Sequence, residues 1–276
     1  MLCTLLLPTP ILAWQPVDLY PREAIGEISK PEAIQRGCVL LEQVLQKSFA
    51  NQQPATTDRA AVLHIDLRDD WHGVTSEHIP PWPPTDQRLQ LRFSPHSIHG
   101  EIEFANGPLA NEIWGVEGKR QGSWGYDVWQ SFTRDASGAK TSGEEQEKAF
   151  IINAYRTMFE LPQIVAAASH AAVITATESE TQSIECIFAT WDSARAQMEN
   201  DQFLIWVDTR TQRIKAAHYT LRALAPDARA ELNFISFSED ARGVFPTQIE
   251  CVLQVHNRRY THRITVEDYH WEIAKK

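Results

Sequence analysis

The stretch that decides the fold runs from Gln202 to Val255 and begins QFLIWVDTRTQRIKAAHYTLR at residues 202–222. Apolar and polar side chains alternate along it, which is the pattern of half-buried strands. Four strands are predicted, at 202–208, 213–222, 231–238 and 248–255. Short turns such as Asp208-Thr209-Arg210-Thr211 join them. Because parallel neighbours need a crossover of about a dozen residues or more, these strands are antiparallel.

The same alternation continues on both sides of this stretch. It predicts a strand before it at 183–190, one after it at 260–271, and five in the first half of the chain, at 61–68, 89–93, 98–104, 109–117 and 123–133. Asn106-Gly107 marks a hairpin turn between two of them. The sequence therefore predicts about ten or eleven antiparallel strands.

Two stretches change to the helical period. Ser29 opens a capping-box pattern with Glu32 and predicts a helix over 29–50. Its apolar stripe is Ile34, Cys38, Leu41, Leu45 and Phe49. Ser142 and Glu145 open a second helical region over 142–170, which Pro162 divides into two helices.

A helix with one apolar stripe needs an apolar surface, and the concave face of a twisted sheet provides one. The predicted fold class is α+β, mostly antiparallel β: a single large twisted sheet forming a half-barrel with a helical lid on its concave face. A closed lipocalin-like barrel is the alternative. No Gly-, Pro- or Ser-rich linker divides the chain. We therefore expect a single half-barrel domain at 29–276, preceded at 1–28 by a signal peptide or an N-terminal arm.

Two details of the 202–255 stretch resemble the LolA/LolB-type lipoprotein-carrier superfamily. One is the Trp206-Val207-Asp208 step at the end of a strand, and the other is Gly243-Val244-Phe245-Pro246-Thr247-Gln248-Ile249 before another strand. The order of helix, strands, helices and strands from Ser29 to Trp271 is also similar. The resemblance implies an unclosed antiparallel half-barrel that holds a lipid or acyl chain under a helical lid.

The composition excludes several function classes. Lys and Arg number 26 against 36 Asp and Glu, a formal net charge of −10. An acidic chain is poorly suited to bind phosphate backbones, so no nucleic-acid partner is expected. Glycine-rich dinucleotide and P-loop motifs do not occur in the sequence. We expect no cofactor.

Few residues suggest catalysis. His64, Asp66 and His72 are the material from which a metal-dependent hydrolase would be built, but the sequence has no H-E-x-x-H pattern. We place them on a solvated strand face and expect no metal. The Gly122-Ser123-Trp124-Gly125 stretch lacks the spacing of a nucleophile elbow. The chain is therefore predicted not to be an enzyme.

Nine Trp residues offer large apolar surfaces with one N–H donor each, which suits the wall of a lipid cavity. Leaving such a cavity wet costs roughly 25 cal/mol for each Å² of apolar surface. The predicted function is a binding or carrier protein for an apolar ligand, a lipid or an acylated lipoprotein, in the cell envelope. The candidate lining residues, taken from alternating strand positions, are Leu91, Phe93, Ile102, Phe104, Trp114, Trp129, Ile205 and Phe234.

The alternative function is a protein-interaction module that displays the Pro- and Trp-rich loop 69–86. An apolar run from Leu2 to Leu12, followed by Ala13, fits the tail of a signal peptide and implies a periplasmic or secreted protein. The run is too short for the roughly 20 residues of a transmembrane helix.

Without Cys3, the cysteines Cys38, Cys186 and Cys251 allow at most one disulfide. We expect Cys38 to be a small buried side chain. A basic spot near the last hairpin consists of Arg258, Arg259, Arg263, His256 and His262. It is interpreted as charge that protects an edge strand, or as a site for an anionic group.

Overall fold

The computed structural model describes residues 18–21, 24–49, 61–72, 86–94, 99–119, 128–143, 146–174, 183–191, 200–222, 224–241, 243–256 and 258–273. The helices in these ranges are α1 (Ile25–Ile28), α2 (Pro31–Lys47) and α3 (Gln146–Ala166). The strands of the first half are β1 (Ala61–His72), β2 (Gln87–Phe93), β3 (Gly100–Phe104), β4 (Ile113–Lys119), β5 (Val128–Arg134) and β6 (Lys140–Gly143). Those of the second half are β7 (His170–Ile174), β8 (Ile184–Thr190), β9 (Gln202–Asp208), β10 (Arg213–Thr220), β11 (Arg229–Asp240), β12 (Gly243–Val255) and β13 (Arg258–Ile273).

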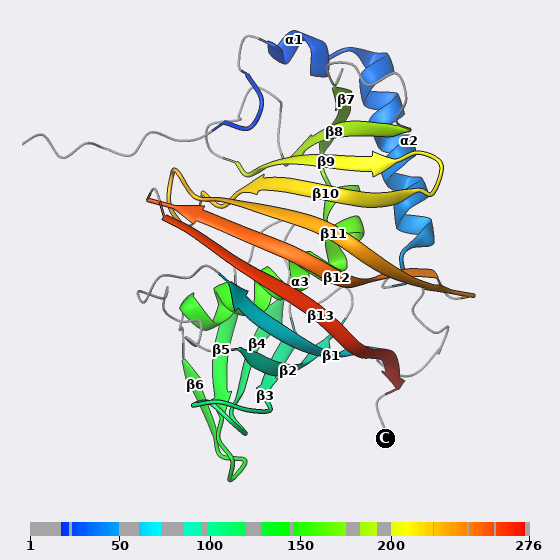
Figure 1. The fold of residues 1–276 in the computed structure, drawn as a ribbon. Coiled ribbons are helices and arrows are strands. Elements are labelled where there is room, and N and C mark those ends of the chain that lie inside the picture. Colours follow the sequence, from blue (N-terminus) through cyan, green and yellow to red (C-terminus); the bar gives the residue numbers. More distant parts are fainter. Residues whose placement is uncertain are drawn as a thin grey trace, which may run out of the picture.

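The thirteen strands form one sheet in the order β6-β5-β4-β3-β2-β1-β13-β12-β11-β10-β9-β8-β7 (Figure 1). Neighbours along each half pair as antiparallel hairpins, and β1 pairs with β13 to join the halves. The order ends at β6 and β7, and α3 is the connection between these two edge strands. The sheet is therefore an open half-barrel, as predicted, rather than the closed alternative.

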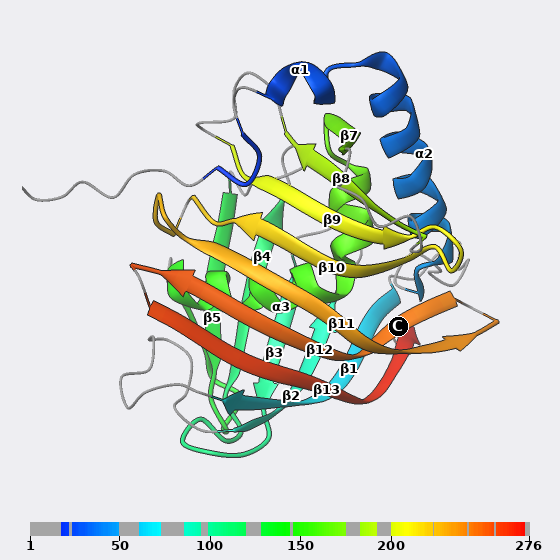
Figure 2. The ribbon, with the colours of Figure 1, turned by 45° about the horizontal axis from the view of Figure 1, so that its top comes forward.

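The sheet curls around α3, which lies on its concave side (Figures 1 and 2). Inward positions of the strands are apolar and alternate with more exposed ones, as in β2, where Leu89, Leu91 and Phe93 are buried. These side chains and those of α3 belong to one hydrophobic cluster. Helix α2 lies beside β7 and α3 and completes the predicted lid.

Helix α3 is kinked near its C-terminal end. Glu160 has non-helical angles (φ −104°, ψ 15°), and Pro162 follows inside the helix. A proline ring removes one backbone donor and clashes with the preceding turn, which accounts for the break. The predicted second helix up to His170 is wrong at its end, because α3 stops at Ala166 and His170 starts β7. The N-terminal capping box is also wrong, since Ser142 lies in β6.

Helix α2 is shorter than the predicted 29–50 and presents a different face. Its N-cap is Lys30 without a side-chain cap, so the Ser29 capping box is wrong. The buried positions are Gly37, Leu40, Leu41 and Val44, whereas Cys38 is exposed. The face is rotated because the helix packs closely on β7. A Cβ at Gly37 would lie 2.9 Å from the backbone of Ala171 and Ala172.

Replacing Gly37 with alanine is expected to lower the free energy of unfolding by about 1 kcal/mol, because the steric cost exceeds the roughly 1 kcal/mol gained in helix propensity. Urea denaturation measures the change. Gly26→Ala is the matched control, because nothing lies within 4 Å of a Cβ there. Equal, stabilising effects of both substitutions would mean that α2 does not pack tightly on β7.

Several predicted strand bounds were wrong. β1 continues through Asp69 to His72, so the first residues of the predicted loop 69–86 are strand. Residues 109–111 are turn, and β4 begins at Ile113. The short strands β6 and β7 were missed. Residues 1–17, most of loop 69–86, and Gly122-Ser123-Trp124-Gly125 lie outside the described residues.

Part of the basic spot near the last hairpin does not protect an edge. From Thr261 onward β13 pairs on both sides, with β1 and β12, so the interpretation is wrong for His262 and Arg263. Arg263 forms an ion pair with Glu250, while His262 is buried. The inward orientation of His262 places it in the site described below.

Candidate functional site

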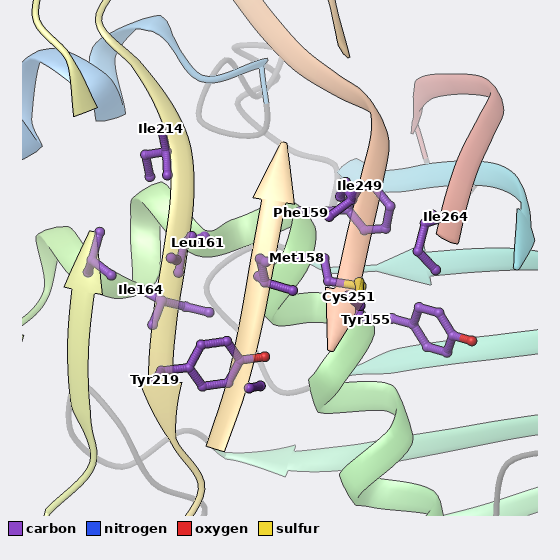
Figure 3. Close-up of a cluster of buried hydrophobic side chains, with 14 of the residues drawn as sticks. Tyr155, Met158, Phe159, Leu161, Ile164, Ile214, Tyr219, Ile249, Cys251 and Ile264 are labelled. Atoms are coloured by element: carbon purple, nitrogen blue, oxygen red, sulfur yellow. The ribbon is translucent and has the colours of Figure 1, made fainter. Parts of the chain in front are cut away.

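A cleft opens at the surface between the C-terminal end of α2, the kink of α3 and strands β10 to β12. Its walls are mainly apolar, and Lys47, Gln212 and Arg213 also line it. The apolar lining includes Val44, Met158, Phe159, Ile214, Phe234 and Phe237 (several are labelled in Figure 3). The cavity volume is about 40 Å³. Ligand pockets typically have volumes of roughly 300–1,000 Å³. Side chains of the lid helices therefore fill most of the space inside the half-barrel.

Aromatic rings form the wall behind this cleft. Phe245 stacks on Tyr269 at 4.2 Å and on Phe159 of α3 at 5.4 Å between ring centroids. Phe49, just after α2, meets Tyr269 edge-on at 4.9 Å. Such pairs add about 0.5–1.5 kcal/mol each beyond the area they bury. Both lid helices are thus held to β12 and β13 by apolar contacts.

A polar cluster is buried under α3. Asp69 of β1 has 0% exposed area, and its carboxylate accepts a short hydrogen bond from the Tyr155 hydroxyl. The other carboxylate oxygen lies 2.7 Å from Nδ1 of His262 on β13. Trp71 stacks on the His262 ring at 4.4 Å. An ionisable pair thus lies among otherwise apolar side chains on the concave face.

Cys251 connects the polar cluster to the cleft. It is the register partner of His262 in the β12–β13 pair. Its Sγ donates to Sδ of Met158 at 3.7 Å, and Met158 lines the cleft (Figure 3). The side chains of Met158 and Cys251 therefore lie between the cleft and the polar cluster.

Burial by itself would lower the pKa of His262, but the charge of Asp69, the neighbouring Cys251 sulfur and the hydrogen bonds to both outweigh burial and raise the pKa to about 10. Burial raises the pKa of the Cys251 thiol despite the nearby imidazole. At neutral pH the cluster therefore holds a protonated imidazole and a neutral thiol. That pairing has neither a free base nor an activated nucleophile.

Sequence reasoning missed this cluster because Asp69 was assigned to a loop. One signal was available. His262 lies between Tyr260 and Ile264 at every second position of the strand, where the alternation predicts inward-facing apolar residues. Asp69 likewise continues the inward series of Leu63, Ile65 and Leu67.

Seven of the eight predicted lining residues are buried in the same hydrophobic cluster as α3. They are Leu91, Phe93, Ile102, Phe104, Trp114, Ile205 and Phe234. Phe234 also lines the cleft. Trp129 belongs to β5, but its side chain lies outside the described residues. The structure thus places these side chains around the lid helix.

The histidines considered for metal binding lie elsewhere. Nδ1 of His64 is 3.4 Å from Nε2 of His270, on the face opposite the buried Leu63 and Ile65. Burial lowers the pKa of His64. Among the described side chains, no three His, Cys, Asp or Glu groups are placed to hold a metal ion. The side chain of His72 is not described.

The cysteines Cys38, Cys186 and Cys251 are all free thiols. Within the described ranges, no helix is long and apolar enough to span a bilayer.

Comparison with known proteins identifies the fold. No protein-family model matches the sequence, and no curated protein matches it either. The solved structures with a similar fold include the following three. A domain described as an outer membrane lipoprotein-sorting protein, from Vibrio parahaemolyticus, has a TM-score of 0.54 at 6% identity, with 87% of this chain and 93% of that chain covered.

The second structure, a DUF1329 family protein from Desulfovibrio piger, has a TM-score of 0.56 at 10% identity and covers 88% of this chain and 95% of its own. The third, a LolA superfamily protein from Nitrosomonas europaea, has a TM-score of 0.50 at 10% identity, with 84% and 92% covered. The chain therefore has the fold of LolA-like, lipoprotein-sorting domains, as the sequence resemblance implied.

Proposed function

We propose that this protein binds and carries an apolar ligand, a lipid or the acyl chains of a lipoprotein, in the cell envelope and without catalysis. The observation that carries the proposal is the cleft beside the kink of α3, which adjoins the apolar cluster between that helix and the concave face. The neighbours' lipoprotein-sorting descriptions support the same role. We further propose that residues 29–276 act as one domain, and that 1–28 direct the protein to the periplasm or outside the cell.

Ligand entry requires the lid to move. An acyl chain does not fit into about 40 Å³. Helix α3 joins the two open edges of the sheet and is broken at Glu160, so its two parts can separate from the strands without breaking a ladder. The proposed binding event exchanges the apolar side chains of α3 for the hydrocarbon of the ligand.

The test uses displacement of the neutral fluorescent probe N-phenyl-1-naphthylamine by fatty-acid methyl esters of 8 to 16 carbons. Affinity is expected to rise with chain length, because each buried CH₂ contributes up to about 0.8 kcal/mol. Phe237→Asn is expected to weaken binding about tenfold, since it removes apolar surface from the cleft.

Ile235→Asn is the matched control. Ile235 lies on the same strand with 52% of its area exposed, and it does not line the cleft. It is expected to bind the esters as the unmodified protein does. If the folded protein binds no ester of any length, the carrier function is wrong. If both variants bind equally well, the cleft is not the entrance.

A further inference from the structure

The buried cluster of Asp69, His262 and Tyr155 is more than an apolar carrier requires. Removing two charges from water is costly, and well-packed apolar residues in their place are often equally stabilising. Strongly perturbed ionisable groups beside a cleft also tend to gather at functional sites. The cluster therefore needs an explanation other than stability.

The three side chains come from elements that differ in their freedom to move. Asp69 and His262 lie on β1 and β13, which pair with each other in the middle of the sheet. Tyr155 lies on α3, the helix that has to leave the concave face. Opening of the lid thus takes a hydroxyl donor away from Asp69 but leaves the Asp69–His262 pair in place.

The cluster is connected to the cleft through Met158 and Cys251. Met158 lines the cleft and contacts Cys251, whose register partner is His262. Met158 and Tyr155 are both on α3, one turn apart. Movement of this turn therefore connects the cleft directly to the carboxylate of Asp69.

We propose that Asp69 selects a neutral long-chain ligand with a hydroxyl group at its inner end, and that this hydroxyl replaces the hydroxyl of Tyr155; this inference rests on the proposed carrier function. A carboxylate accepts a strong, charge-assisted hydrogen bond from such a donor. A buried acceptor that loses its donor is penalised, so a ligand without a hydroxyl binds less well. A ligand with a free carboxylate meets the like charge of Asp69 and is rejected.

The test compares three ligands with the same hydrocarbon chain: 1-tetradecanol, 1-methoxytetradecane and tetradecanoate. The methyl ether keeps the oxygen but has no proton to donate. The alcohol is expected to displace the fluorescent probe at a concentration about tenfold lower than the ether and lower still than the carboxylate. In Asp69→Asn the preference for the alcohol over the ether is expected to fall below threefold.

Tyr155→Phe removes the internal competitor and keeps the charged pair. Both alcohol and ether are expected to bind at least threefold more tightly, with the preference between them retained. Tyr219→Phe is the matched control, because it removes another phenol hydroxyl from the same core and is expected to change neither affinity nor preference.

The outcomes separate the two proposals. Binding of alcohol and ether with equal affinity overturns the selection by Asp69 and leaves the carrier function standing, whereas binding of neither ligand overturns both. If Asp69→Asn does not fold, Tyr155→Phe still tests the proposal. The exchange of hydroxyl groups is contradicted if this variant binds the alcohol no more tightly than the unmodified protein does, or if it loses the preference for the alcohol over the ether.

Discussion

Replacing Asp69 with alanine is expected to lower the free energy of unfolding by about 3–5 kcal/mol, the largest effect of any substitution considered for this chain. Asp69 is fully buried and bonded to both Tyr155 and His262. Its removal leaves the imidazolium of His262 buried without its counter-charge and the Tyr155 hydroxyl without that acceptor. Urea denaturation followed by circular dichroism measures the loss.

A double variant, Asp69→Leu with His262→Leu, isolates the cause. It removes both charges and is expected to be clearly more stable than Asp69→Ala, because no buried charge stays uncompensated. Asp66→Ala is the positional control, since Asp66 lies three residues earlier on β1, partly exposed on the outer face. It is expected to cost less than about 1 kcal/mol. A double variant that is less stable than the single one would contradict this account.

The overall architecture was predictable because it rests on alternation. Short turns between alternating runs leave only antiparallel neighbours, and an amphipathic helix needs a concave sheet. The pairing of β1 with β13 was not visible, since it joins residues about 200 positions apart, such as His64 with His270. Such a contact is specified by complementary shape rather than by a local pattern.

Element ends were predicted less well, for physical reasons. Pro80 to Pro84 led to the whole of 69–86 being taken as loop, yet the breaking effect of proline is local and β1 runs on to His72. The buried face of α2 depends on Gly37, which lets the helix approach β7 closely. Nothing in the 3.6-residue periodicity distinguishes that face from one centred on Cys38.

The same limits apply to the candidate site. Apolar strand positions identified seven of the buried side chains in the cluster around α3, because burial follows alternation. The Asp69–His262 pair was missed because residues 69–86 were taken as a loop and His262 was grouped with the basic residues of the last hairpin. Only the register of β1, β12 and β13 brings them together.

Relative to the double variant, stability is also expected to fall as the pH rises from 6.5 to 8.0, by about 1.5 kcal/mol. The pKa of His262 is raised to about 10 in the folded protein, chiefly by the charge of Asp69 acting against desolvation. The unfolded chain has an ordinary histidine pKa near 6.5. Below this value both states hold the proton, so the stabilisation is fully present. Between the two pKa values only the folded state does, and each pH unit costs up to about 1.4 kcal/mol.

Other titrating groups limit the pH range in which the effect of His262 on stability can be measured. Burial lowers the pKa of His64 and His218, and each of these groups makes stability rise by up to about 0.4 kcal/mol between pH 6.5 and 7.5, where unfolded histidines lose their remaining protons. The raised pKa of the buried Cys186 and Cys251 thiols adds a fall in stability above about pH 8.5, where unfolded thiols ionise. The window from 6.5 to 8.0 therefore reports mainly on His262.

The measurement is a series of urea denaturation curves at pH 6.5, 7.0, 7.5 and 8.0. The Asp69→Leu/His262→Leu double variant retains Cys186, Cys251, His64 and His218, so it serves as the reference for every other titrating group. Its stability is expected to change by no more than about 0.5 kcal/mol across this window, because the group whose proton is lost on unfolding is gone and the effects of the other groups partly cancel. Parallel curves for the two proteins would show that His262 is not charged in the folded state, and that the buried pair is held by a neutral hydrogen bond.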